Sequence, residues 1–421
     1  MKKQLKYHFP QDLKSFVLLL IASIITIIVI DIFLQLSSFA QHSFKKINIL
    51  YPWITFFITP IGFALIITFV KKQQHFVQSA GIPQAIAAMD SRNKKIRHKL
   101  LSFRIAFEKI FFICIAMLFG APIGIEGPSI HIGASIFYGF NHLIQFKRKL
   151  MLHALITIGG SAGLIVAFNA PLAGLIFAYE ELGRNVKKQG YVLIALVGIL
   201  VYFVAIFYRG NDYYLGDYSN INFNFITLWQ LIPLAIISGL LGGVFAKSTL
   251  FLLKKLTTKK TIKIIIIAFV LGLIIAIFNF LSQGNVSGSG HLETQKLLAL
   301  QNLGWEFVIL KFFATLTSLI STIPGGLFMP TISIGAGLGS ELSIFYTQNP
   351  QIIIIFTMIT YLSATIRAPL TATVVILEMT NAMPLLVPAI LLALIANFIS
   401  KKIQKTPLYE ALSQQFLNIN S

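Results

Sequence analysis

One carboxylate in an apolar part of the chain is the first residue that could do chemistry. Glu126 lies between two glycines in the run Gly124–Pro128 (sequence GIEGP), and strongly apolar residues precede and follow this run. These flanks place Glu126 at membrane depth, where burying a charge is costly and an ionisable residue is functional by default. A carboxyl group can take up and release a proton, so we interpret Glu126 as a protonatable gate.

The pattern around Glu126 occurs a second time. Residues 326–336 align with residues 124–134 without a gap, at an offset of 202 residues (326 minus 124), and Phe328 stands in place of Glu126. Gly/Pro-interrupted apolar segments at matching positions of two halves are a sequence pointer to the binding site of a transporter.

A second pair of motifs supports the repeat. Residues 170–173 (APLA) lead to Glu180, and residues 368–371 (APLT) lead to Glu378, at an offset of 198 residues (368 minus 170). A helix that begins inside the membrane exposes unpaired N–H groups and the positive end of its dipole, and such an end attracts an anion. Two such ends, one from each half, can converge on one small anion.

The composition indicates an all-α integral membrane protein. The chain has 421 residues, of which 56% are hydrophobic and 11% are charged, and its mean hydropathy is +0.80. Apolar segments broken by Gly or Pro favour tilted, re-entrant and half-spanning helices, since irregular backbone at this depth must be buried in protein or line a cavity. The stretches long enough to span a bilayer are Phe16–Ile30, Trp53–Val70, Tyr191–Ile206, Leu228–Leu253, Ile262–Leu281 and Leu385–Ile399.

The net charge of +20 fits the positive-inside rule better than a nucleic-acid partner, because the chain has no soluble basic module. A basic funnel that attracts anions is the alternative interpretation. Residues 210–224 carry two aspartates and no Lys or Arg, so we predict that they are external. Lys45 and Lys46 fit less well, since one span after a cytoplasmic N-terminus should place them outside. The basic clusters are Lys71–Lys72, Arg92–Lys99, Lys147–Lys149, Lys187–Lys188, Lys254–Lys263 and Lys401–Lys405.

We expect two transmembrane halves, and we expect the first apolar stretch to be a retained helix rather than a cleaved signal peptide. The single cysteine, Cys114, allows no internal disulfide, and no metal-ligand cluster is present, so we expect no metal and no cofactor. This architecture suggests a bacterial inner membrane. The predicted boundaries are a basic cytoplasmic tail (1–14), half one (15–208), an external linker (209–225), half two (226–405) and a cytoplasmic helix and tail (406–421).

Several other residues allow two interpretations each. Glu180 and Glu181 are adjacent at a helix end, so only one can face the interior, and the spacing does not say which. Tyr409 follows a proline after the last span and is typical of an interfacial anchor, although its hydroxyl could donate to an anion. Lys109 lies in an apolar stretch and is either a buried counter-charge or a snorkelling residue.

A hydrolase-like pattern is also present. Residues 159–163 (GGSAG) match G-x-S-x-G with Ser161 at its centre, but this pattern needs a strand-to-helix elbow and here it lies in a helix-like run. Small residues in membrane helices are far more often packing surfaces, so we expect no enzyme. His131 and His153 lack metal-ligand spacing, which favours structural roles.

Taken together, four motifs in order resemble the CLC family of chloride channels and chloride/proton antiporters. The likeness extends from about residue 12 to residue 417, and residues 366–380 add to it. The motifs are Ser79-Ala80-Gly81-Ile82-Pro83, similar to G-S-G-I-P; Gly124–Pro128, similar to G-R-E-G-P; Gly326–Pro330, similar to G-x-F-x-P; and Pro407-Leu408-Tyr409.

The resemblance implies a homodimer in which each subunit has two inverted halves and its own anion pathway. It implies that Glu126 is the external gate, that Glu181 is the internal proton-transfer glutamate, and that Lys109 is a buried lysine. Channels of the family usually lack an acid at the Glu181 position, so we expect secondary active exchange of chloride for protons; a passive gated channel is the alternative. The implied anion-binding residues are Ala80, Gly81, Ile82, Leu327, Phe328 and Tyr409, with Gly124, Ile125 and Gly127 contributing backbone to an outer site.

Two departures from the family pattern bear on the anion. Ala80 stands where the family has its central serine, which removes one hydroxyl donor. Ile125 stands where the family commonly has arginine, which removes a positive charge beside the gate. An antiporter that prefers fluoride or nitrate is therefore a further alternative.

Overall fold

The computed structural model describes residues 13–72, 76–143, 150–183, 186, 188–210, 212–257 and 261–418. These residues are predominantly α-helical, and the only sheet-like pairing among them is one bridge between Gly124 and Gly326. The all-α fold class is therefore confirmed. Parts of several predicted segments lie outside the described residues: residues 1–12 of the basic tail, the basic cluster Lys147–Lys149, Lys187, residues 258–260 of the basic cluster Lys254–Lys263, residue 211 of the linker and residues 419–421.

Six helices in the described part of the chain are long and apolar enough to cross a membrane. Together with the short 3-10 turns that precede three of them, these helices contain the six stretches named from the sequence, so that prediction is confirmed. Three belong to each proposed half. In chain order they are α1 (Leu13–Leu50), α2 (Thr55–Lys72), α9 (Lys188–Arg209), α10 (Ile232–Thr257), α11 (Thr261–Leu281) and α17 (Leu386–Ile403).

Shorter helices lie between these spans, and apart from α4 the two halves carry them in the same order. Helices of 14 or 15 residues, such as those that begin at Glu126 and Phe328, are too short to cross a bilayer of about 20 helical residues. Half one has α3 (Ile82–Asp90), α4 (Lys94–Leu100), α5 (Phe103–Leu118), α6 (Glu126–Gly139), α7 (Leu150–Phe168) and α8 (Pro171–Phe177). Half two has α12 (His291–Leu298), α13 (Gly304–Ile320), α14 (Phe328–Leu342), α15 (Pro350–Ile366) and α16 (Pro369–Met379), and α18 (Leu408–Asn418) follows the last span.

The helices of the two halves pack in matching pairs. In half one α6 packs on α7, and in half two α14 packs on α15. Both contacts bring backbones close together: a Cβ on Gly133 would lie 2.1 Å from the Gly159 carbonyl oxygen, and one on Gly335 would lie 2.8 Å from the Met358 Cα. Small residues thus let these central helices approach, as they do in membrane proteins generally.

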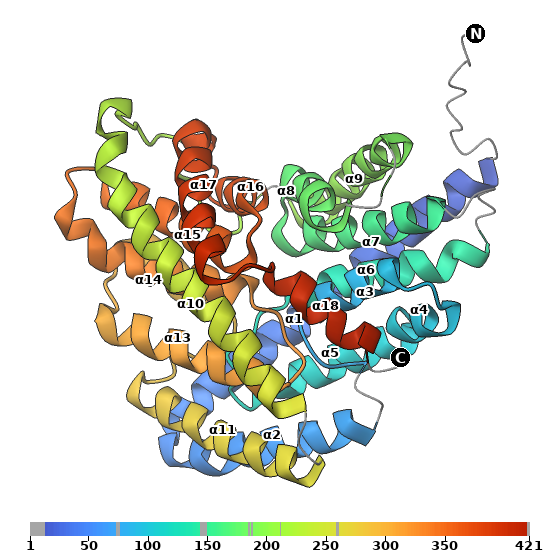
Figure 1. Cartoon of the computed structure of the whole chain (residues 1–421), viewed down its shortest axis with the longest axis horizontal. Helices are drawn as coiled ribbons and strands as arrows, with labels where there is room; N and C mark the ends of the chain where they lie inside the picture. The colour runs from blue at the N-terminus through green and yellow to red at the C-terminus, as the bar shows by residue number, and fades with distance from the viewer. Residues whose placement is uncertain are drawn as a thin grey trace.

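Helices from both halves mix at the centre of the molecule. In Figure 1 most of half one, in blue to green, lies to the right, and most of half two, in yellow-green to red, lies to the left. The exceptions are α2 and α11, which pack side by side at the bottom of the view, and α18, which returns across the middle to pack on α3. The short helices α6 and α14 therefore begin where the halves meet.

Candidate anion and proton pathway

The two repeated motifs meet at a backbone bridge. The Gly124 N–H donates to the Gly326 carbonyl oxygen (2.8 Å), and the Gly326 N–H donates back to the Gly124 carbonyl oxygen (2.7 Å). A Cβ on Gly326 would lie 2.9 Å from the Gly124 carbonyl oxygen, so the approach requires glycine. Because α6 and α14 each begin two residues after their bridging glycine, the bridge brings two helix N-termini together.

Glu126 reaches from the start of α6 to the start of α14. Its side chain is fully buried, and its Oε2 lies 3.5 Å from the Met329 backbone nitrogen, at the outer limit of a hydrogen bond. The residues before the two helices, Ile125 and Leu327, give no side-chain cap to the first turns. The carboxylate therefore lies at a helix end that attracts anions, and it is held there weakly.

The rings of Phe328 and Tyr409 pack together at the start of α14. The two rings stack at a centroid distance of 6.2 Å and an interplanar angle of 10°, and Phe168 and Phe177 pack around Phe328. Tyr409 is fully buried, and its hydroxyl has no hydrogen-bond partner among the described residues. Burial inside the protein differs from an interfacial anchor, and an unpartnered buried hydroxyl is rare enough to need a reason.

The start of α3 completes the cluster. Gly81 has a φ of +101° and precedes the helix, while a Cβ on Gly127 would lie 2.6 Å from the Ala80 carbonyl oxygen. Ala80 and Ile82 are buried at this contact. Three helix starts, those of α3, α6 and α14, thus meet beside Tyr409, and they contain the residues predicted for the anion and for the outer site.

Lys109 is fully buried and donates to the Ser79 carbonyl oxygen at 3.2 Å, in the loop before α3. It therefore does not snorkel to an interface. Its partner in the repeat is Lys311, which was not predicted and lies at the same offset of 202 residues (311 minus 109). Lys311 is also fully buried and donates to the carbonyl oxygens of Val286 (2.9 Å) and Gly288 (3.0 Å). The repeat offset was the signal that could have revealed it.

The two adjacent glutamates in the π-helical turn after α8 (Ala178–Leu182) point in different directions. Glu181 is buried, with 4% of its surface exposed. The Glu180 carboxylate instead accepts hydrogen bonds from the backbone N–H groups of Leu370 (3.2 Å) and Thr371 (2.6 Å), at the start of α16. Glu181 is therefore the inward-facing acid of the pair.

Glu378 mirrors Glu180 in the other half. Its carboxylate accepts hydrogen bonds from the N–H groups of Leu172 (3.0 Å) and Ala173 (2.7 Å), at the start of α8. Each half thus caps a helix of the other half with a carboxylate, and both caps use the positive end of a helix dipole. The APLA and APLT motifs mark these mutual caps rather than the anion pathway.

The hydrolase-like run is a packing surface. Ser161 lies within α7 and donates to the Gly174 carbonyl oxygen at 2.9 Å, and a Cβ on Gly159 would lie 2.3 Å from the Gly133 carbonyl oxygen. No strand-to-helix elbow is present at this position. His131 Nε2 lies 2.8 Å from the Leu100 carbonyl oxygen, which is a structural contact. In the described ranges, no group of three or more His, Cys, Asp or Glu residues could hold a metal ion.

A model described as "voltage gated chloride channel" matches residues 62–401. The chain belongs to this family. The matched range contains the motifs at 79–83, 124–128 and 326–330 and ends before Tyr409.

Three solved structures of CLC proteins are similar in fold. A slow cyanobacterial Cl-/H+ antiporter superposes with a TM-score of 0.83 at 22% identity, covering 97% of this chain and 99% of that one. A CLC-type fluoride/proton antiporter gives 0.74 at 21% identity and covers 94% and 97% of the two chains. A eukaryotic CLC transporter gives 0.73 at 19% identity and covers 96% and 75%. At these identities the likeness shows the fold.

Proposed function

We propose that the protein is a secondary active transporter that exchanges chloride, or a similar small anion, for protons. The observation that carries this proposal is the position of the Glu126 carboxylate at the N-terminal end of α14, 3.5 Å from the Met329 nitrogen. A carboxylate there has the charge and the hydrogen-bonding preference of the anion that the helix end would otherwise bind. One site can therefore hold an ionised gate or an anion, and protonation of the gate releases the site.

The central anion lies, in this proposal, between the backbone N–H groups of Leu327 and Phe328 and the Tyr409 hydroxyl. The buried, unpartnered hydroxyl of Tyr409 supports this, because an anion would supply the missing acceptor. Glu181 relays protons from the inside in this proposal, because it is the buried acid of the Glu180–Glu181 pair. Anion and proton then share Tyr409 and the gate but reach the inner face by different routes.

The remaining assignments rest on this function. We propose a homodimer in a bacterial inner membrane, with halves at 15–208 and 226–405 joined by an external linker at 209–225, a cytoplasmic tail at 1–14 and a cytoplasmic segment at 406–421. Transport moves ions across the membrane without making or breaking covalent bonds, so we propose that the protein is not an enzyme. Residues 210–224 of the linker carry two aspartates and no Lys or Arg, and this charge pattern supports an external linker.

A fluoride or nitrate preference is the second candidate. The observation that favours it is Ala80 at the start of α3, because an alanine offers no hydroxyl to the anion. Fewer side-chain donors leave more of the selectivity to backbone N–H groups and to the size of the site.

Purified protein in liposomes tests the function. Anion efflux is started down its gradient while external pH is recorded and a potassium ionophore clamps the voltage. Uphill proton movement driven by the chloride gradient supports antiport. Chloride efflux without proton movement favours a passive channel and leaves Glu181 without a transport role. Flux of fluoride or nitrate in the absence of chloride flux favours the second candidate.

A further inference from the structure

A cavity lined by both polar and apolar residues lies on the linker side of the gate. Its volume is about 270 Å³, and its lining includes Ile125, the residue before Glu126. Tyr214 of the predicted external linker also lines it, so the cavity is on the side that the linker faces. The C-terminal part of α1, the loop before α12 and the first turn of α12 supply most of the polar groups, which are Gln41, His42, Lys45, Ser287, Ser289, His291 and Glu293.

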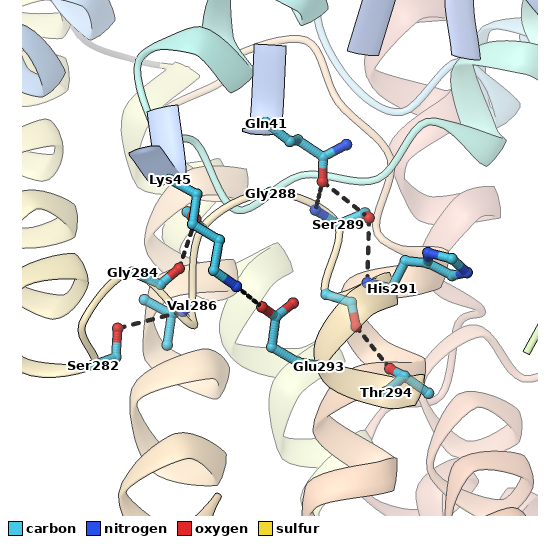
Figure 2. Close-up of polar contacts among 12 residues, drawn as sticks. Gln41, Lys45, Ser282, Gly284, Val286, Gly288, Ser289, His291, Glu293 and Thr294 are labelled. Atoms are coloured by element: carbon cyan, nitrogen blue, oxygen red, sulfur yellow. Dashed lines mark hydrogen bonds and ion pairs between the residues drawn. The ribbon is translucent and has the colours of Figure 1, made fainter. Parts of the chain in front are cut away.

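An ion pair lies in the wall of this cavity. Lys45 Nζ and Glu293 Oε1 are 2.6 Å apart, with side-chain exposures of 20% and 5% (Figure 2). Gln41, one turn earlier on α1, accepts hydrogen bonds through Oε1 from the Ser289 N–H (2.9 Å) and hydroxyl (3.2 Å). Both partners of the ion pair are therefore held in place by the same two elements, α1 and the start of α12.

Among the residues that the structure describes, Lys45 is the only lysine or arginine that lines the cavity. Its ammonium has three N–H donors, and Glu293 accepts one of the hydrogen bonds that they can make. Ile125, which lies deeper toward the gate, offers no charge and no side-chain donor. An anion that approaches the gate from this side therefore meets Lys45 as the cation of the cavity.

We propose that this cavity is an outer anion-binding site in which Lys45 recruits the transported anion and Glu293 limits how tightly it is held. Glu293 acts electrostatically on the buried Lys311 as well as on Lys45, so it offsets part of the charge of two lysines. A site on a transport pathway must bind strongly enough to fill and weakly enough to empty. The Glu293 carboxylate keeps the anion affinity of the site low enough for the anion to leave. This assignment rests on the proposed anion transport.

The alternative is an ion pair that only fixes α1 against α12. The two interpretations predict different directions of change in anion transport when each partner of the ion pair is removed. If the pair is structural, removing either partner loosens the same contact and harms transport in the same direction. If the pair sets the potential of an outer site, removing the cation weakens anion capture, whereas removing the carboxylate strengthens it.

The test compares Lys45→Gln and Glu293→Gln in membrane vesicles of both orientations. Labelled chloride exchange is measured against chloride concentration on the outer face of the vesicle, with gluconate holding the ionic strength constant. Lys46→Gln is the matched control, because Lys46 is the next residue on α1, carries the same charge and is exposed away from the lining. Exchange by the unaltered protein in both orientations measures the proposed function by itself.

In right-side-out vesicles we expect Lys45→Gln to raise the apparent KM for chloride by about three- to tenfold, and Glu293→Gln to lower it by a similar factor. Inverted vesicles and the Lys46→Gln control should keep the KM of the unaltered protein. Opposite shifts confined to the outer face support the site. Shifts of both variants in the same direction, or equal shifts from the two faces, would overturn it in favour of a structural ion pair.

Discussion

Replacing Glu126 with glutamine tests the gate most directly. The amide keeps the size of the carboxylate and an oxygen that can accept from Met329, so the contact at 3.5 Å can persist while the charge and the titratable proton are lost. A gate that no longer ionises cannot compete with an anion and cannot carry a proton. We therefore expect chloride flux to continue and coupled proton movement to fall to background.

The expected gain in anion binding follows from Coulomb's law. Two unit charges of like sign about 4 Å apart repel by about 4 kcal/mol at an effective dielectric constant of about 20, which is roughly a thousandfold in occupancy. Mobile side chains and water screen part of this repulsion, so we expect apparent chloride affinity to increase by about tenfold. As pH falls, protonation neutralises Glu126 in the unaltered protein, and the difference between the two proteins should shrink.

The assay is chloride efflux from liposomes with chloride and pH electrodes read together. Glu306→Gln is the matched control, because Glu306 is exposed in the first turn of α13 and undergoes the same chemical change away from the pathway. Its ratio of protons to chloride should equal that of the unaltered protein. Coupled proton movement that survives in Glu126→Gln would show that the gate lies elsewhere.

Three further changes probe the elements around the gate. Ala80→Ser adds a hydroxyl at the start of α3 and should shift the order of anion preference, measured as relative flux of chloride, nitrate and fluoride; an unchanged order would mean that Ala80 does not face the anion. Gly326→Ala places a Cβ 2.9 Å from the Gly124 carbonyl oxygen, so we expect about 1–3 kcal/mol of strain, a lower melting temperature in detergent and impaired transport. Glu378→Ala leaves the N–H groups of Leu172 and Ala173 without their acceptor and should cost about 3 kcal/mol of stability, whereas a melting temperature equal to that of Glu306→Ala would argue against the cap.

The sequence predicted those parts of the structure that depend on local pattern and on the repeat. The six spans and the start of α6 at the Glu126 motif followed from apolar length and from Gly and Pro positions. The direction of Glu181 did not follow, because adjacent helical residues differ in direction but the sequence does not say which one faces inward. That direction is set by α16, whose backbone N–H groups bind Glu180 from 190 and 191 residues away.

The outer cavity could not be read from the sequence for a related reason. Lys45 was recognised only as a poor fit to the charge pattern, and its partner Glu293 is 248 residues further along the chain. No local pattern links α1 to α12, since their contact exists only once both halves have packed. Lys311 differs from these residues because the repeat itself predicts it, once Lys109 is taken as the first member of a pair.

The repeat also explains how a symmetric scaffold carries a directional function. Both halves use a glycine bridge, a buried lysine that binds the loop before a short helix, and a carboxylate that caps the opposite half. These shared parts fix the backbone and leave two helix ends facing one point. The halves differ at the position that reaches this point, where one has Glu126 and the other has Phe328. In the proposed mechanism a proton can therefore be taken up at one helix end only, with Glu126 as the outer gate and the stacked rings of Phe328 and Tyr409 on its inner side.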